Sequence, residues 1–175
     1  MAFTSDQVLA FLEENGIVAR TSQHAPVFTV AQSQALRGEI PGVHTKNLFL
    51  RDAKRGYFLV VADEARKIDL KRMRKAIGAR GSLSFGSPAE LQALLGIQPG
   101  AVSLLACIND KGNGVRVVLD QSLLSANLVN CHPLTNERTT SLTSADVLMF
   151  LNKIGHEPLC IDLAEAGPAA EASEP

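Results

Sequence analysis

The sequence predicts an α/β fold, in which a single domain holds one mixed sheet with flanking helices. Two observations favour it. Three segments carry the end signals of helices, and the segments between them are short and apolar, with the strand character of residues 57–62. Unbroken apolar runs of this length are typical of strands that helices cover on both faces. A chain of 175 residues is also long enough to bury one core without disulfide bonds.

The three predicted helices share the same signals at their ends. Each begins with a capping hydroxyl, carries an acidic or amide residue three positions on, and is followed by a terminating glycine. Pro88 at the first helical position strengthens the second of them. The starts are Thr4 with Gln7, Ser87 with Glu90 and Thr143 with Asp146, and the terminating glycines are Gly16, Gly96 and Gly155.

The segments between the helices predict strands, each a short run of apolar or β-branched residues. The predicted strands are 17–21, 43–50, 57–62, 83–85, 104–108, 115–119, 127–131 and 139–142. Gly56 and the segment 111–114 are predicted to be hairpin turns. We expect one domain over residues 1–163, followed by a disordered acidic tail over 164–175, which is rich in Ala, Glu and Pro.

Composition and charge argue against several classes of protein. No apolar run reaches the length of a membrane span, and the first residues lack the basic and apolar regions of a signal peptide. We therefore expect a cytoplasmic protein that does not bind membranes. The net charge of -1 argues against a protein that holds nucleic acid by bulk electrostatics, and DNA is not an expected partner.

A run of positive charge stands out between residues 66 and 75. Six of these ten residues are basic, and a single acid, Asp69, opposes them. Such a run is most often the solvated face of a helix, and it would also serve as a modest patch that contacts phosphates. The basic residues are Arg66, Lys67, Lys71, Arg72, Arg74 and Lys75.

Lys46 is the first candidate for a functional residue. It leads into the apolar stretch 48–50, so its aliphatic stem should lie against the core while its ammonium reaches a cleft, where it could bind phosphate or polarise a carbonyl. His132 and Asn136 lie in a distant polar turn, and the two segments together indicate a small polar site on an apolar scaffold. Plainer interpretations stay open: a surface lysine at the start of a strand, and an ordinary turn at 132–133.

Standard catalytic and metal-binding signatures are absent from the sequence. It has no nucleophile elbow, Walker loop, dinucleotide-binding glycine pattern or His-Glu-x-x-His motif, and its histidines do not fall at metal-ligand spacing. We therefore expect a site without metal or cofactor. Cys131 beside His132 could be a nucleophile and its base, but neighbours in a strand point to opposite faces. Three reduced, mostly buried thiols are the simpler interpretation.

A series of short segments along the chain follows the order found in one known family. The segments are 24–30, 46–52, 69–71, 83–85, 99–103, 109–110, 118–120, 132–136 and 155–158, and they include His24-Ala25-Pro26, Lys46-Asn47 and His132-Pro133-Leu134. Together they resemble the YbaK/prolyl-tRNA synthetase editing-domain family, and within it the free-standing alanyl-tRNA(Pro) deacylases. The likeness runs from residue 3 to about residue 160, and it implies the editing-domain fold.

The resemblance implies an activity, the hydrolysis of the ester that joins a wrong amino acid to tRNA(Pro), on product that the synthetase has released. In this family Lys46 corresponds to the characteristic functional lysine and His132 to the pocket histidine. No protein nucleophile is implied, because water attacks the carbonyl with help from the 2'-hydroxyl of the terminal adenosine. Asn47 and Asn136, in the same two motifs, are expected to bind the substrate.

The resemblance also implies a loop whose backbone amides face the substrate. The family pattern is Gly-x-x-x-Pro, and here Leu104 takes the place of the proline, which leaves the rigidity of the loop open. The loop residues are Gly100, Ala101, Val102 and Ser103. A pocket too small for proline would select alanine, as in the second sieve of an editing enzyme. The apolar residues expected to set its volume are Phe28, Val30 and Val43.

Alternatives stay open at this stage. The same chemistry could act on another mischarged product, such as Cys- or Ser-tRNA. A non-catalytic module that docks on a synthetase or a tRNA is a second possibility, and a plain amino-acid ester hydrolase is a third. The expected partner is tRNA(Pro) mischarged with alanine, contacted by the basic run at 66–75, in a transient encounter that could involve prolyl-tRNA synthetase or elongation factor.

Overall fold

A computed structural model describes residues 1–26, 32, 35 and 38–164 of the chain. The predicted tail therefore lies outside the described residues, apart from Ala164. The helices are α1 (Ser5–Glu14), α3 (Leu70–Ala76), α4 (Pro88–Leu95) and α5 (Ser144–Lys153), with the 3-10 helices η1 (Leu104–Asn109) and η2 (Gln121–Ser125). The strands are β1 (Arg20–Gln23), β2 (Val43–Asp52), β3 (Tyr57–Asp63), β4 (Leu83–Phe85), β5 (Val115–Asp120), β6 (Val129–Cys131), β7 (Arg138–Leu142) and β8 (Leu159–Ile161).

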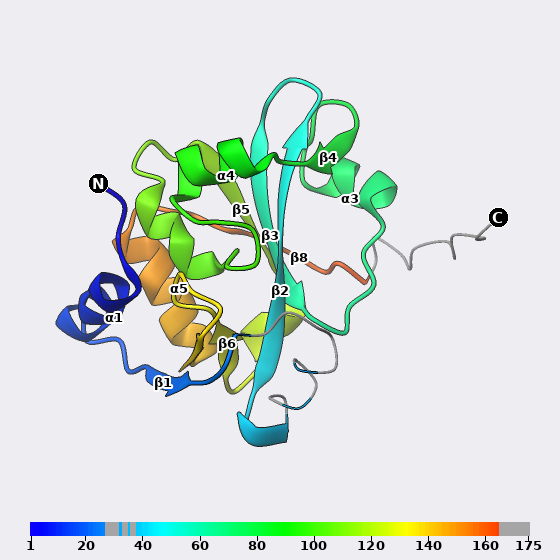
Figure 1. Cartoon of the computed structure of the whole chain (residues 1–175). Coiled ribbons are helices and arrows are strands. Elements are labelled where there is room, and N and C mark those ends of the chain that lie inside the picture. The colour runs from blue at the N-terminus through cyan, green and yellow to red at the C-terminus, as the bar shows by residue number, and fades with distance from the viewer. Residues whose placement is uncertain (27–31, 33–34, 36–37, 165–175) are drawn as a thin grey trace.

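The strands form one mixed sheet in the order β1-β7-β6-β2-β3-β5-β8, and β4 pairs with β2 outside this path. The pairs β2–β6, β3–β5 and β5–β8 are parallel, and the other pairs are antiparallel. Helices α1, α4 and α5 lie on one side of the sheet and α3 lies on the other (Figure 1). The predicted α/β class, with a mixed sheet and flanking helices, is confirmed.

Two hydrophobic cores, one on each face of the sheet, hold these layers together. Alternation along β3 divides its side chains between them, so that Leu59 and Val61 belong to the large core while Phe58 and Val60 belong to the small one. The large core takes residues from α1, α4, α5 and η1, and α3 closes the small core with Met73. Burial on both faces explains why β3 is an unbroken apolar run.

The three predicted helix starts are confirmed. Thr4 and Ser87 each form a capping box with the residue three positions on, and the Thr143 side chain accepts a hydrogen bond from the backbone N–H three positions on. Gly96 ends α4 in the left-handed conformation, with φ of 64°. These starts depend on hydrogen bonds within one turn of chain, so a short stretch of sequence is enough to predict them.

The prediction of a strand at 104–108 is wrong, because this segment forms η1. The Ser103 hydroxyl caps the helix by accepting from the N–H of Leu105 at 3.2 Å. All the side chains from 104 to 108 are buried in the large core. A short, continuous apolar run has the same sequence pattern in a buried strand and in a buried helical turn. The periodicity of the run therefore cannot distinguish the two.

Strand boundaries at the two edges of the sheet also differ from the prediction. The strand predicted at 17–21 begins at Arg20, because Ile17 still belongs to the end of α1, where its N–H donates to the carbonyl of Leu12 at 2.9 Å. β8 was not predicted. It is a three-residue strand beside β5, too short to carry a period that sequence analysis can detect.

One of the two predicted hairpin turns is confirmed. Gly56 lies in the turn that joins the antiparallel strands β2 and β3. The segment 111–114 is not a hairpin turn, because it links η1 to β5. Its shape is set by Asp110, whose carboxylate accepts from the N–H groups of Gly114 and Val115 at 3.0 and 2.7 Å.

Gly86 allows the chain after β4 to approach β2 closely, and we predict that Gly86→Ala destabilises the fold. A β-carbon there would lie 2.3 Å from the ring of Phe49, which is stacked on Tyr57 with ring centroids 5.8 Å apart. Overpacking of this kind costs about 1–3 kcal/mol of the free energy of unfolding. Urea denaturation measures it, with Gly112→Ala as the control because no atom lies within 4 Å of its new β-carbon. Equal stability of the two variants would contradict the prediction.

Candidate functional site

The middle of β2 has no strand partner along one of its edges. β6 pairs with Val43 and His44, β4 pairs with residues 50–52, and both lie on the edge opposite β3. Among the described strands, none pairs with residues 45–49 on that edge. The stretch of β2 that holds Lys46 therefore has one unpaired edge, just beyond the end of β6, where the turn of His132 begins. We call this unpaired edge the opening along β2.

Lys46 lies on the face of β2 that carries the small core, because side chains alternate along a strand and Leu50 packs into that core. The side chain is half-buried, and its ammonium donates to the backbone carbonyl of Arg66. Burial lowers the pKa of Lys46 from the ordinary value of 10.5, and the carboxylates of Asp63 and Glu64 oppose that shift. The result is a cation at the edge of an apolar core, as the sequence predicts.

His132 follows β6 directly and is half-buried. Its Nδ1 lies 3.0 Å from the carbonyl oxygen of Arg138. A carbonyl oxygen can only accept, so Nδ1 carries the proton and Nε2 of the neutral ring is an acceptor. Burial lowers the pKa of His132 below its ordinary value of 6.5, which favours the neutral ring at neutral pH.

Glu64 connects the lysine and the histidine electrostatically. It follows β3, and its N–H donates to the carbonyl of His44 at 2.9 Å. Its carboxylate raises the pKa of both Lys46 and His132, so it lies near both groups. The charge of one carboxylate therefore acts on both predicted residues, although they are far apart in the sequence.

Two further histidines surround His132. The ring centroids of His24 and His132 are 6.5 Å apart, and both His24 and His44 lower the pKa of His132. Nδ1 of His24 donates to the carbonyl of Ala25, so its Nε2 accepts from the hydroxyl of the buried Thr139, each at 2.8 Å. These bonds fix the orientation of the His24 ring at the site.

Cys131 does not act as a partner of His132. It packs into the large core, on the other face of the sheet from Asn130, which pairs with His44. Burial raises the pKa of its thiol to about 12, against a weaker opposing hydrogen bond with Thr45. The thiol is protonated at neutral pH and is a poor nucleophile. Cys107 is also buried, whereas Cys160 is exposed, so the expectation of mostly buried thiols holds for two of three.

Asn47 and Val43 lie on the face of β2 opposite Lys46. Val43 packs against the large core. The Asn47 amide donates to the hydroxyl of Thr45 at 3.4 Å, and its buried carbonyl oxygen has no hydrogen-bond partner among the described residues. Neither of these two predicted pocket residues therefore lies on the face that carries Lys46, and Val43 lies in the part of β2 that pairs with β6.

Some polar groups of the predicted substrate loop at 100–103 are already used in hydrogen bonds within the protein. Gly100 is exposed and adopts φ of 94°. The Ala101 N–H donates to the carbonyl of Gln98 at 3.1 Å, and Val102 packs against the large core. Ser103 is fully buried as the cap of η1. Leu104, which replaces the family's proline, begins that helix inside the core, so the loop is anchored by burial at its end.

The turn that holds His132 has an unusual backbone. Leu134 has φ of 62°, and its N–H donates to the carbonyl of His132 at 2.9 Å while its side chain packs against the large core. A positive φ at a branched residue costs energy that the surrounding contacts must offset. Asn136 is half-buried in the same turn. Phe28 and Val30, the other predicted pocket residues, lie outside the described residues.

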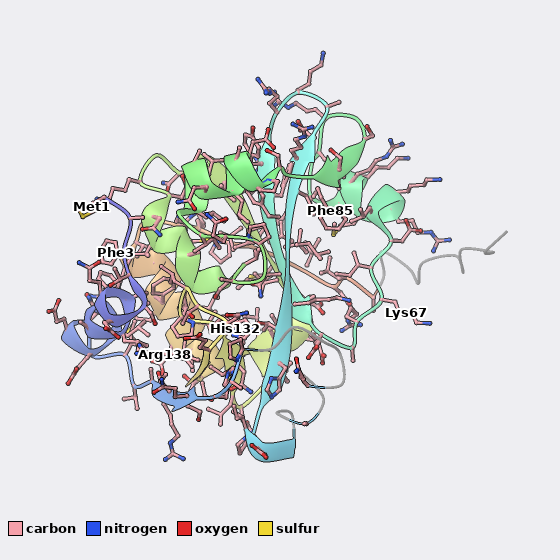
Figure 2. The ribbon with its side chains drawn as sticks, viewed as in Figure 1. Met1, Phe3, Lys67, Phe85, His132 and Arg138 are labelled. Atoms are coloured by element: carbon pink, nitrogen blue, oxygen red, sulfur yellow. The ribbon has the colours of Figure 1, made fainter. Side chains whose placement is uncertain are left out.

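The six residues of the predicted basic run do not share one environment. Lys71, Arg72, Arg74 and Lys75 line one hollow of about 860 Å³ between α3, η2 and β8, together with Asp162. Lys67 is exposed and projects from the chain before α3 (Figure 2). Arg66 is different, because its guanidinium binds Asp120 with Nε 2.9 Å from the carboxylate.

Within the described ranges, no group of three His, Cys, Asp or Glu side chains is arranged to hold a metal ion. The histidines at the site are engaged with protein groups instead. A search of the same residues finds no helix that has both the length and the apolar character to cross a membrane.

The fold and the site together define an α/β domain with a polar site at an opening in its sheet. The family model of the aminoacyl-tRNA editing domain matches residues 24–150, which include Lys46, the loop at 100–103 and His132. The chain therefore belongs to the aminoacyl-tRNA editing domain family, and the resemblance seen in the sequence is confirmed.

Curated relatives extend this likeness over most of the chain. The chain is 38% identical over 157 residues to the prolyl-tRNA editing protein ProX of Acetoanaerobium sticklandii, covering 89% of this chain and 95% of that protein. It is 35% identical over 153 residues to the prolyl-tRNA synthetase associated domain-containing protein 1 of Danio rerio, covering 86% and 83%.

Solved structures share the fold at lower identity. The crystal structure of the hypothetical protein APE2540 superposes with a TM-score of 0.71 at 20% identity, over 89% of this chain and 97% of that one. A second structure, titled as a candidate trans-editing enzyme for prolyl tRNA synthetase, has a TM-score of 0.69 at 19% identity, over 93% and 98%. These likenesses support the editing-domain fold.

Sequence analysis missed His24, His44, Glu64 and Thr139 as neighbours of the site. Their sequence spacing follows no motif, because they lie in or just after different strands, which meet only in the sheet. The one available signal was that His24 lies in a segment shared with the editing-domain family. Their positions follow from the pairing of β2 with β6 and of β7 with β1.

We predict that Glu64→Gln lowers the pKa of both His132 and Lys46, because the protonated forms lose a nearby negative charge. NMR titration of the imidazole and lysine side chains measures both values. The wild-type His132 should titrate below 6.5, the ordinary value, and lower still in the variant. Glu13→Gln on the exposed side of α1 is the control. A His132 pKa above 6.5, or a His132 pKa that is the same in the wild type and in Glu64→Gln, would contradict this description of the site.

Proposed function

We propose that the chain is a trans-editing deacylase that hydrolyses alanine from mischarged tRNA(Pro) in the cytoplasm. One observation carries the proposal: in an aminoacyl-tRNA editing domain, the parallel register that pairs His44 with Asn130 sets Lys46 and His132, each two residues further on, beside the unpaired stretch of β2. The printed names of two relatives, an editing protein for prolyl-tRNA and a protein with a prolyl-tRNA synthetase associated domain, support tRNA(Pro) as the substrate.

Lys46 is proposed to bind the substrate next to the scissile ester. An ammonium in a partly desolvated site stabilises the negative charge that develops on the carbonyl oxygen as water attacks. It could also hold the terminal phosphate, since lysine binds such groups as a point charge. Either contact orients the ester relative to the opening along β2.

His132 is proposed to accept a hydrogen bond at Nε2 from the substrate or the attacking water. The Arg138 carbonyl fixes the proton on Nδ1, and burial keeps the ring neutral, so this nitrogen offers its lone pair. The 2'-hydroxyl of the terminal adenosine helps to position the water. Because an aminoacyl ester is already activated, positioning and charge stabilisation supply most of what catalysis requires, and no protein nucleophile is needed.

Selection of alanine over proline is proposed to depend on pocket volume. A pocket with room for a methyl group excludes a larger ring more strongly than a large pocket rejects a small side chain. Cys- and Ser-tRNA are the alternative substrates, because their side chains are only slightly larger. A non-catalytic module that docks on prolyl-tRNA synthetase, elongation factor or tRNA is the alternative of a different class.

We predict that the purified protein removes alanine from Ala-tRNA(Pro) at least tenfold faster than it removes proline from Pro-tRNA(Pro), because proline does not fit the pocket. Lys46→Ala should lower the rate by about 100-fold, the usual effect of losing one group that stabilises a developing oxyanion. Release of the radiolabelled amino acid measures the rate after subtraction of the buffer rate. Lys54→Ala, an exposed lysine in the β2–β3 turn, is the matched control.

Different outcomes of this assay point to different functions. Loss of alanine no faster than in buffer would remove the proposal, and tRNA binding without turnover would favour the docking module. Faster loss of cysteine or serine would change the substrate. Equal activity on tRNA ending in 2'-deoxyadenosine would indicate a plain ester hydrolase. A folded Lys46→Ala variant with full activity would contradict the assigned site.

We also propose that the basic residues of the 66–75 run other than Arg66 contact the tRNA backbone. These residues are Lys67, Lys71, Arg72, Arg74 and Lys75. Four of them gather around the hollow beside α3, and α3 covers the same face of the sheet that carries Lys46. A tRNA whose 3' end lies at Lys46 would therefore pass its charged backbone over this helix. Asp162 in the same hollow limits the positive potential, which suits a transient contact.

Charge reversal at Lys71 and Lys75 should raise KM and weaken the dependence of KM on salt. Each phosphate contact that is lost lowers the slope of log KM against log salt by about one unit. Kinetics at several salt concentrations measure this slope. Lys153→Glu on α5, on the other side of the sheet, is the control. An unchanged slope in the double variant would contradict the contact and would indicate that the 66–75 run is only a solvated helix face.

A further inference from the structure

Arg66 differs from the rest of the basic run, because hydrogen bonds fix both its backbone and its side chain. Its carbonyl accepts from the ammonium of Lys46, and its N–H donates to the carbonyl of Asp63 at 2.9 Å. Its Nε donates to the carboxylate of Asp120 at 2.9 Å. One residue thus links the proposed catalytic lysine on β2 to an acid at the end of β5.

Asp120 is a buried anchor for this link. Its side chain is 0% exposed. The hydroxyl of Ser122 donates to Oδ2 at 2.9 Å, and the N–H of Leu163 donates to Oδ1 at 3.3 Å. A buried carboxylate is tolerated only when it is paired and hydrogen-bonded, and in the described part of the chain Arg66 supplies the ion pair. The position of Arg66 is therefore set by a charge that cannot move into water.

We propose that Arg66 is a positioning residue for Lys46: its pair with Asp120 holds in place the backbone carbonyl that accepts from the Lys46 ammonium. The inference rests on the proposed function, because it gives Arg66 a task in deacylation. The contact partner of the ammonium is a backbone atom, so the side chain of Arg66 acts only through the position of its own main chain.

The turn that carries Arg66 needs such an anchor. It leaves β3 at Asp63, whose carboxylate accepts from the N–H of Ala65 at 2.9 Å, and the chain then crosses to α3. This bond shapes the turn locally, and the N–H of Glu64 ties the start of the turn to the carbonyl of His44 on β2. The pair with Asp120 connects the Arg66 end of the turn to β5. A lysine on a four-carbon stem needs a fixed acceptor, because a misplacement of about 1 Å in an active site costs about 100-fold in rate.

The same geometry argues against Arg66 as a phosphate contact. Its side chain is 26% exposed, whereas that of Arg72, which lines the hollow beside α3, is 64% exposed. A phosphate that bound the Arg66 guanidinium would compete with a fully buried carboxylate. The two roles predict different kinetics. A positioning role lowers kcat, and a phosphate contact raises KM and changes its salt dependence.

The test compares Arg66→Lys and Asp120→Asn with the wild-type chain. Arg66→Lys keeps the positive charge but replaces the planar guanidinium, so a simple phosphate contact would survive it. We expect kcat for Ala-tRNA(Pro) to fall by about tenfold or more in both variants, with KM and its salt slope unchanged. Arg80→Lys is the matched control, because Nε of Arg80 lies 3.4 Å from the buried Asp52 at the other end of β2.

A second measurement follows the lysine itself and needs no tRNA. Limited acetylation with an amine-reactive ester, read by mass spectrometry, reports how accessible the Lys46 amine is. We expect severalfold faster modification at position 46 in Arg66→Lys and Asp120→Asn, because the ammonium loses its fixed acceptor. Asp63 and Glu64, the carboxylates that also act on Lys46, are unchanged in these variants. Circular dichroism checks that each variant is folded. If Asp120→Asn does not fold, Arg66→Lys alone carries the test.

The outcomes separate the two proposals. Faster acetylation at position 46 with a lower kcat supports the positioning role. Unchanged acetylation in both variants overturns it, as does a raised KM with unchanged kcat, which would make Arg66 a tRNA contact. A wild-type chain without deacylase activity overturns the proposed function, and the acetylation rates then still decide whether the Asp120–Arg66 pair controls Lys46.

Discussion

The site depends on one constraint in the sheet. Along one edge of β2, two short strands pair with its two ends and leave the middle of the edge unpaired among the described residues. β6 pairs with its first two residues and β4 with its last three. Residues between them belong to a strand that is central in the sheet, yet the described part of the chain offers them no strand on that side. A central strand is normally closed to ligands on both edges. In the proposed function the substrate binds beside this unpaired stretch, and a strand holds functional groups more precisely than a loop does.

The same constraint accounts for the electrostatics of the site. Leu48 and Leu50 continue the face of Lys46 into the small core, and the Lys46 ammonium donates to the carbonyl of Arg66. Partial burial depresses the pKa of Lys46 and of His132, and Glu64 moderates both shifts. The proposed mechanism uses this combination, with the Lys46 ammonium as a donor and the neutral His132 ring as an acceptor.

Local signals made some of this predictable from the sequence. The caps at Thr4, Ser87 and Thr143 act within one turn of chain. The burial of β3 on both faces of the sheet is visible in the sequence as an unbroken apolar run. The segment 104–108 was misread because burial on all sides removes the period that separates strand from helix. Lys46 and His132 could be selected through the family pattern, but their meeting depends on parallel pairing between distant strands. Glu64, just after β3, and Asp120, at the end of β5, are placed by the pairing of β3 with β2 and with β5, and no local pattern marks them.

A crystal structure with 3'-deoxy-3'-(alanylamino)adenosine, a stable amide analogue of the aminoacylated tRNA end, tests the central claim most directly. The account predicts that the analogue lies at the opening along β2, with its carbonyl oxygen within hydrogen-bond distance of Nζ of Lys46 and with Nε2 of His132 facing the same acyl group. An analogue bound in the hollow beside α3, or at a place where it touches neither side chain, would contradict it.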